Sequence, residues 1–155
     1  MEYTAAVPSP LGNLILTSDG QALTGLTIGG TAPSKNDSLP LFDSVKAWLS
    51  VYLDGRDPGP VPCPLAPYGT EFQKQIWKLL LEIPYGKTLS YGDLAVQSGR
   101  SPKSAQAVGQ AVGRNPIAIL IPCHRVLDRN GSLTGYAWGT DIKKALLDLE
   151  SENNL

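Results

Sequence analysis

Cys123 and His124 are adjacent in the chain, and His124 is its only histidine. A thiol beside an imidazole is a candidate nucleophile, because the thiolate is the reactive form and histidine can take its proton. The structural alternative is a core cysteine next to a surface histidine. Adjacent residues of an extended segment point to opposite sides. A Cys–His contact would therefore need a sharp turn or a bridging water.

Metal and disulfide chemistry fit these residues less well. A tetrahedral zinc site made of cysteine and histidine needs four ligands. The chain has two cysteines, Cys63 and Cys123, and one histidine, and two of these three residues are adjacent. We therefore expect no metal and no cofactor. A disulfide between the two cysteines is disfavoured in a reducing compartment, and Cys63 receives no role.

The composition is that of a globular protein. The chain has 155 residues, of which 42% are hydrophobic and 17% are charged, with a net charge of −1. This length fits one compact domain or two small ones, and the composition argues against extended disorder. No apolar run has the length of a membrane span, and the first residues do not follow the pattern of a signal peptide. We expect a cytoplasmic monomer that does not bind membranes.

The charge is unevenly distributed along the sequence. Residues 1–84 hold five Lys and Arg against eight Asp and Glu, whereas residues 85–146 hold eight against three. The last nine residues are acidic again. A basic block inside an acidic protein indicates an anionic partner for that block, although random scatter would explain it equally well.

The first part of the chain is predicted to hold strands and one helix. Residues 1–30 contain short apolar runs separated by a hairpin signal at residues 18–20. Residues 39–54 show the apolar spacing of an amphipathic helix. Five prolines then fall within residues 55–69, which no helix or central strand tolerates. We place the boundary between two domains here, and assign residues 1–65 and 66–155 to them.

The second part is predicted to be mainly helical. Thr70 caps a helix that ends near residue 84, and Ser90 caps a short helix over residues 91–97. Ser101 and a following proline open the next helix, at about residues 103–112. Two short helices joined by a tight glycine turn are typical of a helix-turn-helix. Small residues on the second helix would let either DNA or a neighbouring helix approach closely.

The candidate nucleophile follows a short apolar run. Residues 117–121 have the length of a strand buried on both faces, and they lead directly into Cys123. Residues 128–139 are predicted to be a glycine-rich loop. Asp141 then caps a final helix that extends through Glu150. On this interpretation, a buried strand delivers the thiol to its site.

Seven segments in this part of the chain resemble one protein family in the same order. Residues 121–126, Ile-Pro-Cys-His-Arg-Val, resemble the acceptor-cysteine signature of the O6-alkylguanine-DNA alkyltransferases, also called methylated-DNA–protein-cysteine methyltransferases. Residues 69–73, 83–86, 89–91, 107–109, 114–116 and 131–139 are similar to further family motifs. The N-terminal part resembles the family more loosely, in the turn at residues 9–12.

The resemblance implies an α+β protein. Its small β-rich, ribonuclease-H-like N-terminal domain would support a helical C-terminal domain with a winged helix-turn-helix. The implied partner is double-stranded DNA containing O6-alkylguanine, approached from the minor-groove side. The damaged base would be flipped into a pocket, and its alkyl group would move irreversibly to Cys123. Each molecule would then act once.

The resemblance also implies roles for individual residues. Cys123 would be the nucleophile, His124 its base through a water molecule, and Glu150 the carboxylate that orients His124. Tyr91 would donate a hydrogen bond to the leaving guanine, and Asn115 would hold the turn of the active site. The residues implied as walls of the substrate pocket are Pro122, Val126, Tyr136, Ala137 and Trp138.

The DNA-binding candidates combine the basic block with the second helix of the helix-turn-helix. They are Arg100, Lys103, Ser104, Ala105, Gln106, Arg114 and, by resemblance, Arg125. Gln106 departs from the family, which usually carries arginine there to fill the space left by the flipped base. We expect weaker DNA binding as a result. Trp138 stands where some members have glycine, and we expect it to narrow the pocket against bulky alkyl groups.

Other functions explain fewer of these residues. A damage sensor related to the family would bind the lesion without transfer, but such proteins lack the acceptor cysteine. A winged-helix regulator would leave Cys123, His124 and Glu150 unexplained. A cysteine hydrolase needs a direct Cys–His pair and an oxyanion hole, and the adjacency of the two residues argues against one.

Overall fold

The computed structural model describes residues 2–31, 38–133 and 135–152, and it divides into two units. The first unit comprises residues up to Tyr68 together with Pro116–Ala118. The second comprises Gly69–Asn115 and the residues from Ile119 onward. The continuous part of the first unit ends at Tyr68, and the short later segment Pro116–Ala118 joins that unit.

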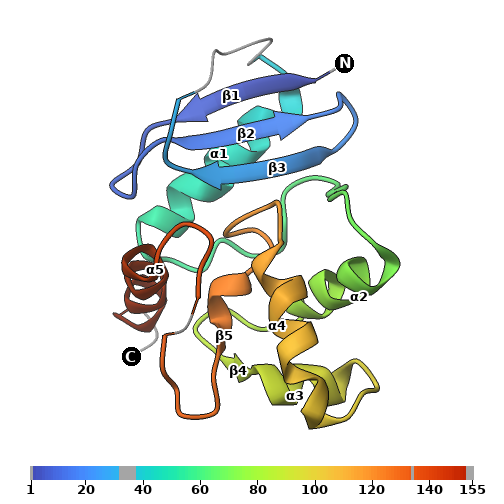
Figure 1. Cartoon of the computed structure of the whole chain (residues 1–155). Helices are drawn as coiled ribbons and strands as arrows, with labels where there is room; N and C mark the ends of the chain where they lie inside the picture. Colours follow the sequence, from blue (N-terminus) through green and yellow to red (C-terminus); the bar gives the residue numbers. More distant parts are fainter. Residues whose placement is uncertain (1, 32–37, 134, 153–155) are drawn as a thin grey trace. The chain divides into compact units, whose positions relative to one another are not determined.

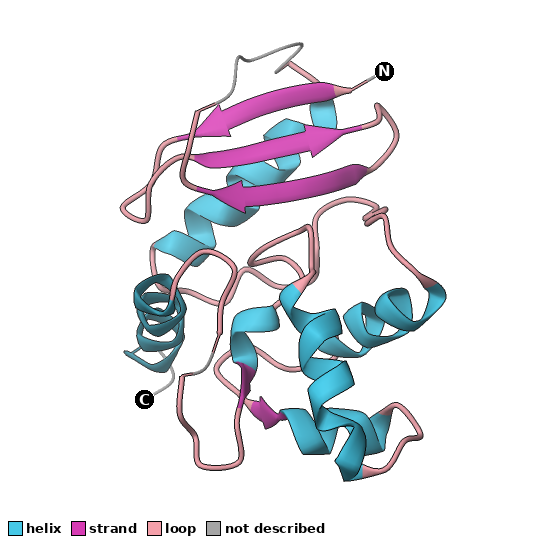
Figure 2. Ribbon diagram, viewed as in Figure 1, coloured by secondary structure: helices cyan, strands magenta, loops and turns pink. Residues whose placement is uncertain are grey.

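A three-stranded antiparallel sheet and one helix form the first unit (Figures 1 and 2). The strands are β1 (Tyr3–Val7), β2 (Leu14–Ser18) and β3 (Leu23–Ile28), in that spatial order. Helix α1 (Pro40–Leu53) lies behind the sheet in the view of Figure 1. The strands and the helix match the expected positions to within a few residues.

The turn between β2 and β3 follows from its residue types. The Asp19 carboxylate accepts hydrogen bonds from the backbone N–H groups of Gln21 and Ala22, at 2.8 and 2.9 Å. Gly20 adopts a φ of 98°, a conformation that glycine reaches without steric cost. The predicted hairpin is therefore confirmed.

Two distant segments pair with the free edge of β3. Leu23 N–H donates to the Pro64 carbonyl at 2.9 Å, within the proline-rich stretch. Leu26 N–H donates to the Pro116 carbonyl at 2.9 Å, and Ala118 N–H donates back to Leu26. These short pairings cover an edge that would otherwise expose unpaired backbone groups.

The strand predicted for residues 117–121 is not formed. Only Ile117 makes an isolated bridge, and the next residues turn away, with Ile119 at a φ of 70°. The apolar run was read correctly as buried, since all five residues are less than 9% exposed. Burial alone does not distinguish a strand from a compact turn, and this explains the error.

The second unit contains helices whose first residues agree with the capping signals. Helix α2 (Glu71–Leu80) begins after Thr70, whose side chain forms a capping box with Gln73. Helix α3 (Tyr91–Gln97) begins after Ser90, which caps Asp93 N–H at 3.0 Å. Both caps were predicted, although α2 ends four residues earlier than expected.

The remaining elements of the second unit include the turn that carries Cys123. They are β4 (Leu89–Ser90), the 3₁₀ turn η1 (Pro102–Ser104), α4 (Ala105–Gly113), the 3₁₀ turn η2 (Cys123–Arg125), β5 (Val126–Leu127) and α5 (Thr140–Glu152). The predicted helix at residues 103–112 is thus a 3₁₀ turn followed by α4. β4 and β5 pair in parallel, and α2 packs on α4, where Trp77 Nε1 donates to the Ala111 carbonyl at 2.8 Å.

The loop between β5 and α5 is irregular, as the sequence predicts, and residue 134 of this loop lies outside the described residues. Within the part of the chain that the structure describes, no helix combines the length and the apolar character needed to cross a membrane.

Candidate active site

Cys123 begins the turn η2 and lies inside the second unit, with 4% of its surface exposed. Its backbone N–H donates to the Ile121 carbonyl at 2.7 Å, which closes a tight turn immediately before the thiol. Burial raises the pKa of the Cys123 thiol to about 11, and a hydrogen bond with Asn115 and the charge of Lys143 partly counteract that rise. The thiol is therefore protonated at neutral pH and needs a base to react.

Asn115 holds the segment that delivers Cys123. Its side-chain Nδ2 donates to the Ile121 carbonyl at 2.8 Å, and the residue is only 3% exposed. The chain between them passes through Ile119, a β-branched residue with a positive φ. Such a conformation is costly, and neighbouring contacts must stabilise it. The side chain of Asn115 is thus bonded to the turn that precedes Cys123.

His124 meets Glu150 across the second unit. Its Nε2 lies 2.5 Å from Glu150 Oε2, and the two side chains are 0% and 1% exposed. Burial lowers the pKa of His124, and this effect outweighs the opposing hydrogen bond and charge of Glu150. The imidazole is therefore neutral near pH 7. With Nε2 donating to the carboxylate, Nδ1 carries the lone pair that can accept a proton.

The geometry of Cys123 and His124 differs from the extended segment assumed from the sequence. Both residues belong to the 3₁₀ turn η2, so their side chains do not alternate as they would in a strand. A sharp turn, one of the two alternatives considered from the sequence, is therefore present at these residues.

Arg125 lies inside the protein and not on a DNA-binding surface. It is 8% exposed, and its Nε and Nη2 donate to the two oxygens of Glu150 at 2.8 and 3.2 Å. Its Nη1 donates to the Ile83 carbonyl at 2.7 Å. This corrects the expectation that Arg125 contacts DNA phosphates, because its guanidinium is already hydrogen-bonded to Glu150 and Ile83.

Glu150 thus has two cationic or hydrogen-bonding neighbours on η2, and it also accepts from the Gly86 backbone N–H at 3.0 Å. Burial by itself raises the pKa of Glu150, but the hydrogen bonds and charges of His124 and Arg125 together lower it to about 2. Glu150 is therefore ionised at any physiological pH. Its carboxylate joins α5, the turn η2 and the loop that follows α2.

Lys143 is a site residue that was not singled out from the sequence. It is fully buried on α5, and its Nζ lies 6.0 Å from the centroid of the Tyr91 ring. Burial lowers its pKa, whereas the charges of Cys123 and Asp128 raise it. The spacing of Lys143, Leu146 and Glu150 could have revealed it, because residues three and seven apart share one helix face.

A small cavity adjoins Cys123. Its volume is about 20 Å³, close to that needed for one water molecule. The residues lining it are Tyr91, Gly109, Val112, Gly113, Cys123, Gly135, Tyr136, Ala137 and Trp138. Tyr136, Ala137 and Trp138 were predicted as pocket walls and do line it. Pro122 and Val126 do not line it and are buried elsewhere in this unit.

Aromatic side chains shape this cavity. Tyr136 and Trp138 meet edge to face, with ring centroids 5.2 Å apart. Burial and the neighbouring Cys123 raise the pKa of Tyr136, so its hydroxyl stays protonated. Tyr91 packs against α4, where a Cβ added at Gly109 would lie 3.5 Å from its ring. Part of the small-residue surface of α4 therefore serves contact with α3.

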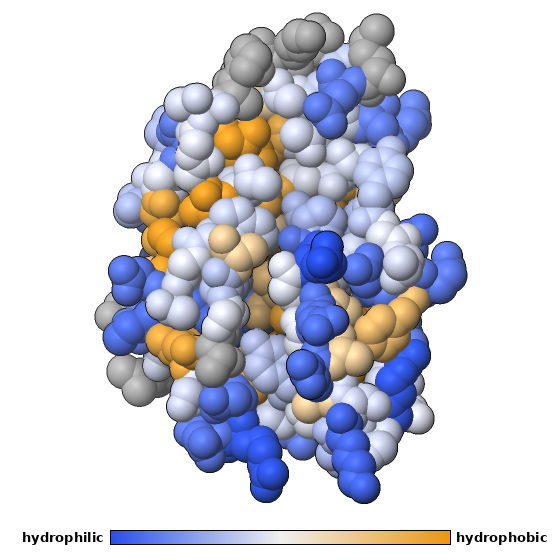
Figure 3. Space-filling model, in the orientation of Figure 1, coloured by the Kyte–Doolittle hydropathy of each residue, from blue (hydrophilic) through white to orange (hydrophobic). Residues whose placement is uncertain are grey.

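The DNA-binding candidates differ in exposure. Lys103, Gln106 and Arg114 are exposed, whereas Ser104 and Ala105 are half-buried. Arg100 is also half-buried: it donates to Gln75 at 3.0 Å and lies over the Phe72 ring at 4.5 Å. In the view of Figure 3, hydrophilic residues gather at the lower end of the molecular surface, where Figure 1 places α3 and the loop after β5.

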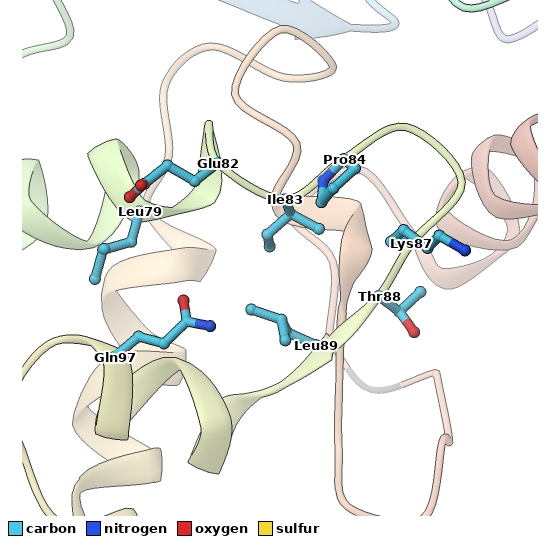
Figure 4. Close-up of a pocket in the computed structure, with 8 residues that line it drawn as sticks. All are labelled: Leu79, Glu82, Ile83, Pro84, Lys87, Thr88, Leu89 and Gln97. Carbon is cyan, nitrogen blue, oxygen red and sulfur yellow. The ribbon is translucent and has the colours of Figure 1, made fainter.

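A larger hollow in the second unit lies away from the thiol. It has a volume of about 430 Å³ and is lined by Leu79, Glu82, Ile83, Pro84, Lys87, Thr88, Leu89 and Gln97 (Figure 4). Ile83, Leu89 and Gln97 point toward one another, whereas Lys87 points outward. None of the candidate catalytic residues lines this hollow, so its size does not make it the site.

The assembled groups suit nucleophilic chemistry at Cys123. The site combines a buried thiol, a neutral imidazole hydrogen-bonded to an ionised carboxylate, and a buried lysine. Within residues 2–31, 38–133 and 135–152, no cluster of three His, Cys, Asp or Glu side chains could hold a metal ion. The described groups can remove the thiol proton and deliver a sulfur nucleophile into the adjoining cavity.

Comparisons with known proteins agree on one family. Residues 71–152 match the family model described as 6-O-methylguanine DNA methyltransferase, DNA binding domain. The methylated-DNA–protein-cysteine methyltransferase of Haemophilus influenzae is 42% identical, over 96% of this chain and 86% of that protein. The Mycobacterium tuberculosis protein of the same name is 43% identical, over 97% of this chain and 93% of its own.

Solved structures extend the agreement to the fold. The crystal structure of Mycobacterium tuberculosis O6-methylguanine methyltransferase superimposes with a TM-score of 0.85 at 39% identity, covering 99% of this chain and 94% of that one. A structure of the same organism's protein in complex with DNA gives a TM-score of 0.87 at 40% identity, covering 96% and 92%.

Proposed function

The chain belongs to the methylated-DNA–protein-cysteine methyltransferases, and from this premise we propose that it moves an alkyl group from O6 of guanine to its own Cys123. The observation that carries this assignment is the buried Cys123 thiol, which follows Asn115 and precedes the His124–Glu150 pair beside a small cavity. The preferred lesion is O6-methylguanine in double-stranded DNA.

The proposed reaction is a displacement at carbon. His124 takes the proton of the Cys123 thiol through a water molecule, and Glu150 stabilises the imidazolium that forms. The sulfur then bonds to the alkyl carbon while the bond between that carbon and guanine O6 breaks. The bonding electrons pass to the guanine, and Tyr91 donates a hydrogen bond to the base as it gains electron density.

The buried lysine assists the first step. Ionisation of Cys123 is unfavourable because the thiol is buried. The positive charge of Lys143 near the sulfur favours the thiolate. The thiolate is thus formed only transiently, when the substrate is in place.

The reaction ends with a thioether on Cys123. Its carbon–sulfur bond is not hydrolysed under ordinary conditions, so the nucleophile is consumed. We therefore assign one turnover to each molecule, with no cofactor.

The target base must leave the DNA helix to reach the sulfur. Cys123 is 4% exposed, and the adjoining cavity is too small for a purine. Extrusion of a base costs a few kcal/mol, and a damaged base that pairs poorly costs less. The loop carrying Tyr136 and Trp138 would move to widen the cavity for the flipped guanine.

Helices α3 and α4 are proposed to form the helix-turn-helix that binds DNA from the minor-groove side, with the loop after β5 as the wing. The exposed Lys103 and Arg114, together with Gln106, are the contacts that the surface supports. Phosphate contacts would dominate, so binding would be sensitive to salt and nearly independent of sequence. The sheet and α1 of the first unit would form the supporting, ribonuclease-H-like domain.

A stoichiometry experiment tests this function. A fixed amount of protein is mixed with increasing excess of a duplex carrying one O6-methylguanine, and the restored guanine is counted after digestion of the DNA. We expect one guanine restored per protein molecule and no further repair with time. A yield that keeps rising would contradict single turnover, and lesion binding with no restored guanine would indicate a damage sensor.

A further inference from the structure

Arg125 is hydrogen-bonded to the Glu150 carboxylate and to the main chain. Two of its nitrogens bind the two oxygens of Glu150, at 2.8 and 3.2 Å, and a third binds the Ile83 carbonyl. The guanidinium also lies 5.8 Å from the Tyr85 ring centroid. It is therefore held in one place from three sides, next to the carboxylate that binds His124.

Without Arg125, the carboxylate and imidazole would form an isolated buried pair. A proton on His124 would then convert a lone buried negative charge into a neutral ion pair, which is favourable in a medium of low dielectric constant. With Arg125 in place, the carboxylate charge is already balanced. The same proton would leave a net positive charge inside the protein.

We propose that Arg125 is a positioning residue of the reaction: by balancing the charge of Glu150, it keeps the His124 imidazole neutral and able to accept the proton of Cys123. The inference rests on the proposed function, because that function requires a neutral imidazole to act as the base. A protonated His124 has no lone pair for the thiol proton.

The charged groups around His124 also change its pKa. The charged groups facing it are Arg125 on η2, and Glu150 and Lys143 on α5. Burial is the largest cause that lowers the pKa of His124; Glu150 raises it, while Arg125 and Lys143 lower it. Arg125 is bonded directly to the Glu150 carboxylate. Its removal therefore changes both the local charge and the geometry of the pair.

Because His124 is the single histidine of the chain, its protonation can be measured without interference from other imidazoles. Uniformly ¹⁵N-labelled, untagged protein gives one pair of imidazole nitrogen signals by NMR, and their shifts report the protonation of His124 as pH is varied. In the natural protein we expect the imidazole to stay neutral from pH 8 to below its ordinary pKa of about 6.5. In Arg125→Gln we expect the midpoint to rise by about one pH unit or more relative to the natural protein.

Three further variants make the result specific. Arg125→Lys keeps the positive charge and is expected to restore most of the low midpoint. The double variant Arg125→Met with Glu150→Gln removes both charges, so its His124 should also stay neutral. Arg56→Gln removes an exposed arginine of the first unit, 67% exposed and paired with Asp54, and should leave the titration unchanged.

The outcomes separate this inference from the proposed function. A folded Arg125→Gln protein whose midpoint does not move would overturn the inference, as would a raised midpoint in the double variant. If Arg125→Gln does not fold, the His124 titration midpoints of Arg125→Lys and of the double variant test the inference instead. The pH profile of alkyl transfer should show its acidic limb at higher pH in Arg125→Gln. A shifted titration in a protein that transfers no alkyl group at all would instead reject the proposed function.

Discussion

Glu150 Oε2 lies 2.5 Å from His124 Nε2, although 26 positions separate the two residues in the chain. The same carboxylate binds Arg125 and the backbone of Gly86. One buried anion of α5 therefore organises the turn that carries Cys123.

Replacing Glu150 by glutamine should slow alkyl transfer. The amide cannot stabilise a protonated imidazole, and general-base assistance accounts for about 10²–10⁴-fold in rate. We expect single-turnover transfer to fall by about a hundredfold or more, measured by rapid quenching with excess protein over lesion DNA. Asp148→Asn is the matched control on the same helix, since Asp148 is exposed and pairs with Lys144 at the surface. Equal rates for both variants would contradict the assigned role.

Stability should fall in acid because both members of the buried pair have lowered pKa values. A group with a lowered folded-state pKa stabilises the protein above its unfolded pKa, and this contribution is lost as the pH falls. For Glu150 the pKa falls from 4.5 to about 2, which corresponds to ~3 kcal/mol. His124 adds a loss that begins below pH 6.5.

Urea denaturation at pH 7.5, 5.5, 4.5 and 3 measures this dependence. We expect the free energy of unfolding to decrease at each step toward acid. The decrease between pH 4.5 and 3 should be smaller in Glu150→Gln than in the natural protein, because the titrating group is gone. An identical decrease in both proteins would show that other carboxylates are responsible.

Trp138 should limit the size of the alkyl group. Its indole lines the cavity beside Cys123 and packs edge to face on Tyr136. We expect the natural protein to react well with O6-methylguanine and poorly with O6-benzylguanine. Trp138→Ala should raise the ratio of benzyl to methyl transfer by about tenfold or more. Trp48→Ala, on α1 of the first unit, is the control, and a similar change there would point to a general loss of structure.

Gln106 should limit DNA affinity. It lies exposed near the start of α4 and brings no charge to the position where the family usually has arginine. We expect Gln106→Arg to bind a lesion-containing duplex more tightly and to repair it faster, as measured by fluorescence anisotropy and single-turnover kinetics. Gln110→Arg, one helical turn later, adds the same charge. Equal gains for both variants would indicate a general electrostatic effect and not a role for position 106.

Local signals predicted much of the second unit. The caps at Thr70 and Ser90 are side-chain interactions within three residues, so the sequence contains all of their information. The pairing of His124 with Glu150 depended on family resemblance, because a contact across 26 residues leaves no local pattern. The helix position of Glu150 alone would have suggested an ordinary exposed charge.

The errors have a common physical origin. Arg125 was assigned to DNA by family resemblance and as part of the basic block, but it is buried against a partner far away in the chain. The run at residues 117–121 was assigned to a strand because it is apolar, but the Asn115 side chain and the positive φ of Ile119 turn it into a compact loop. In both cases tertiary contacts override the local preference.

The most direct test of the central claim is the intact mass of the protein after reaction with a duplex carrying one O6-methylguanine. We predict a complete mass increase equal to one CH₂ unit, which peptide mapping assigns to Cys123 and not to Cys63, and no increase in Cys123→Ser. An unmodified Cys123 after prolonged incubation with bound lesion DNA would contradict the account.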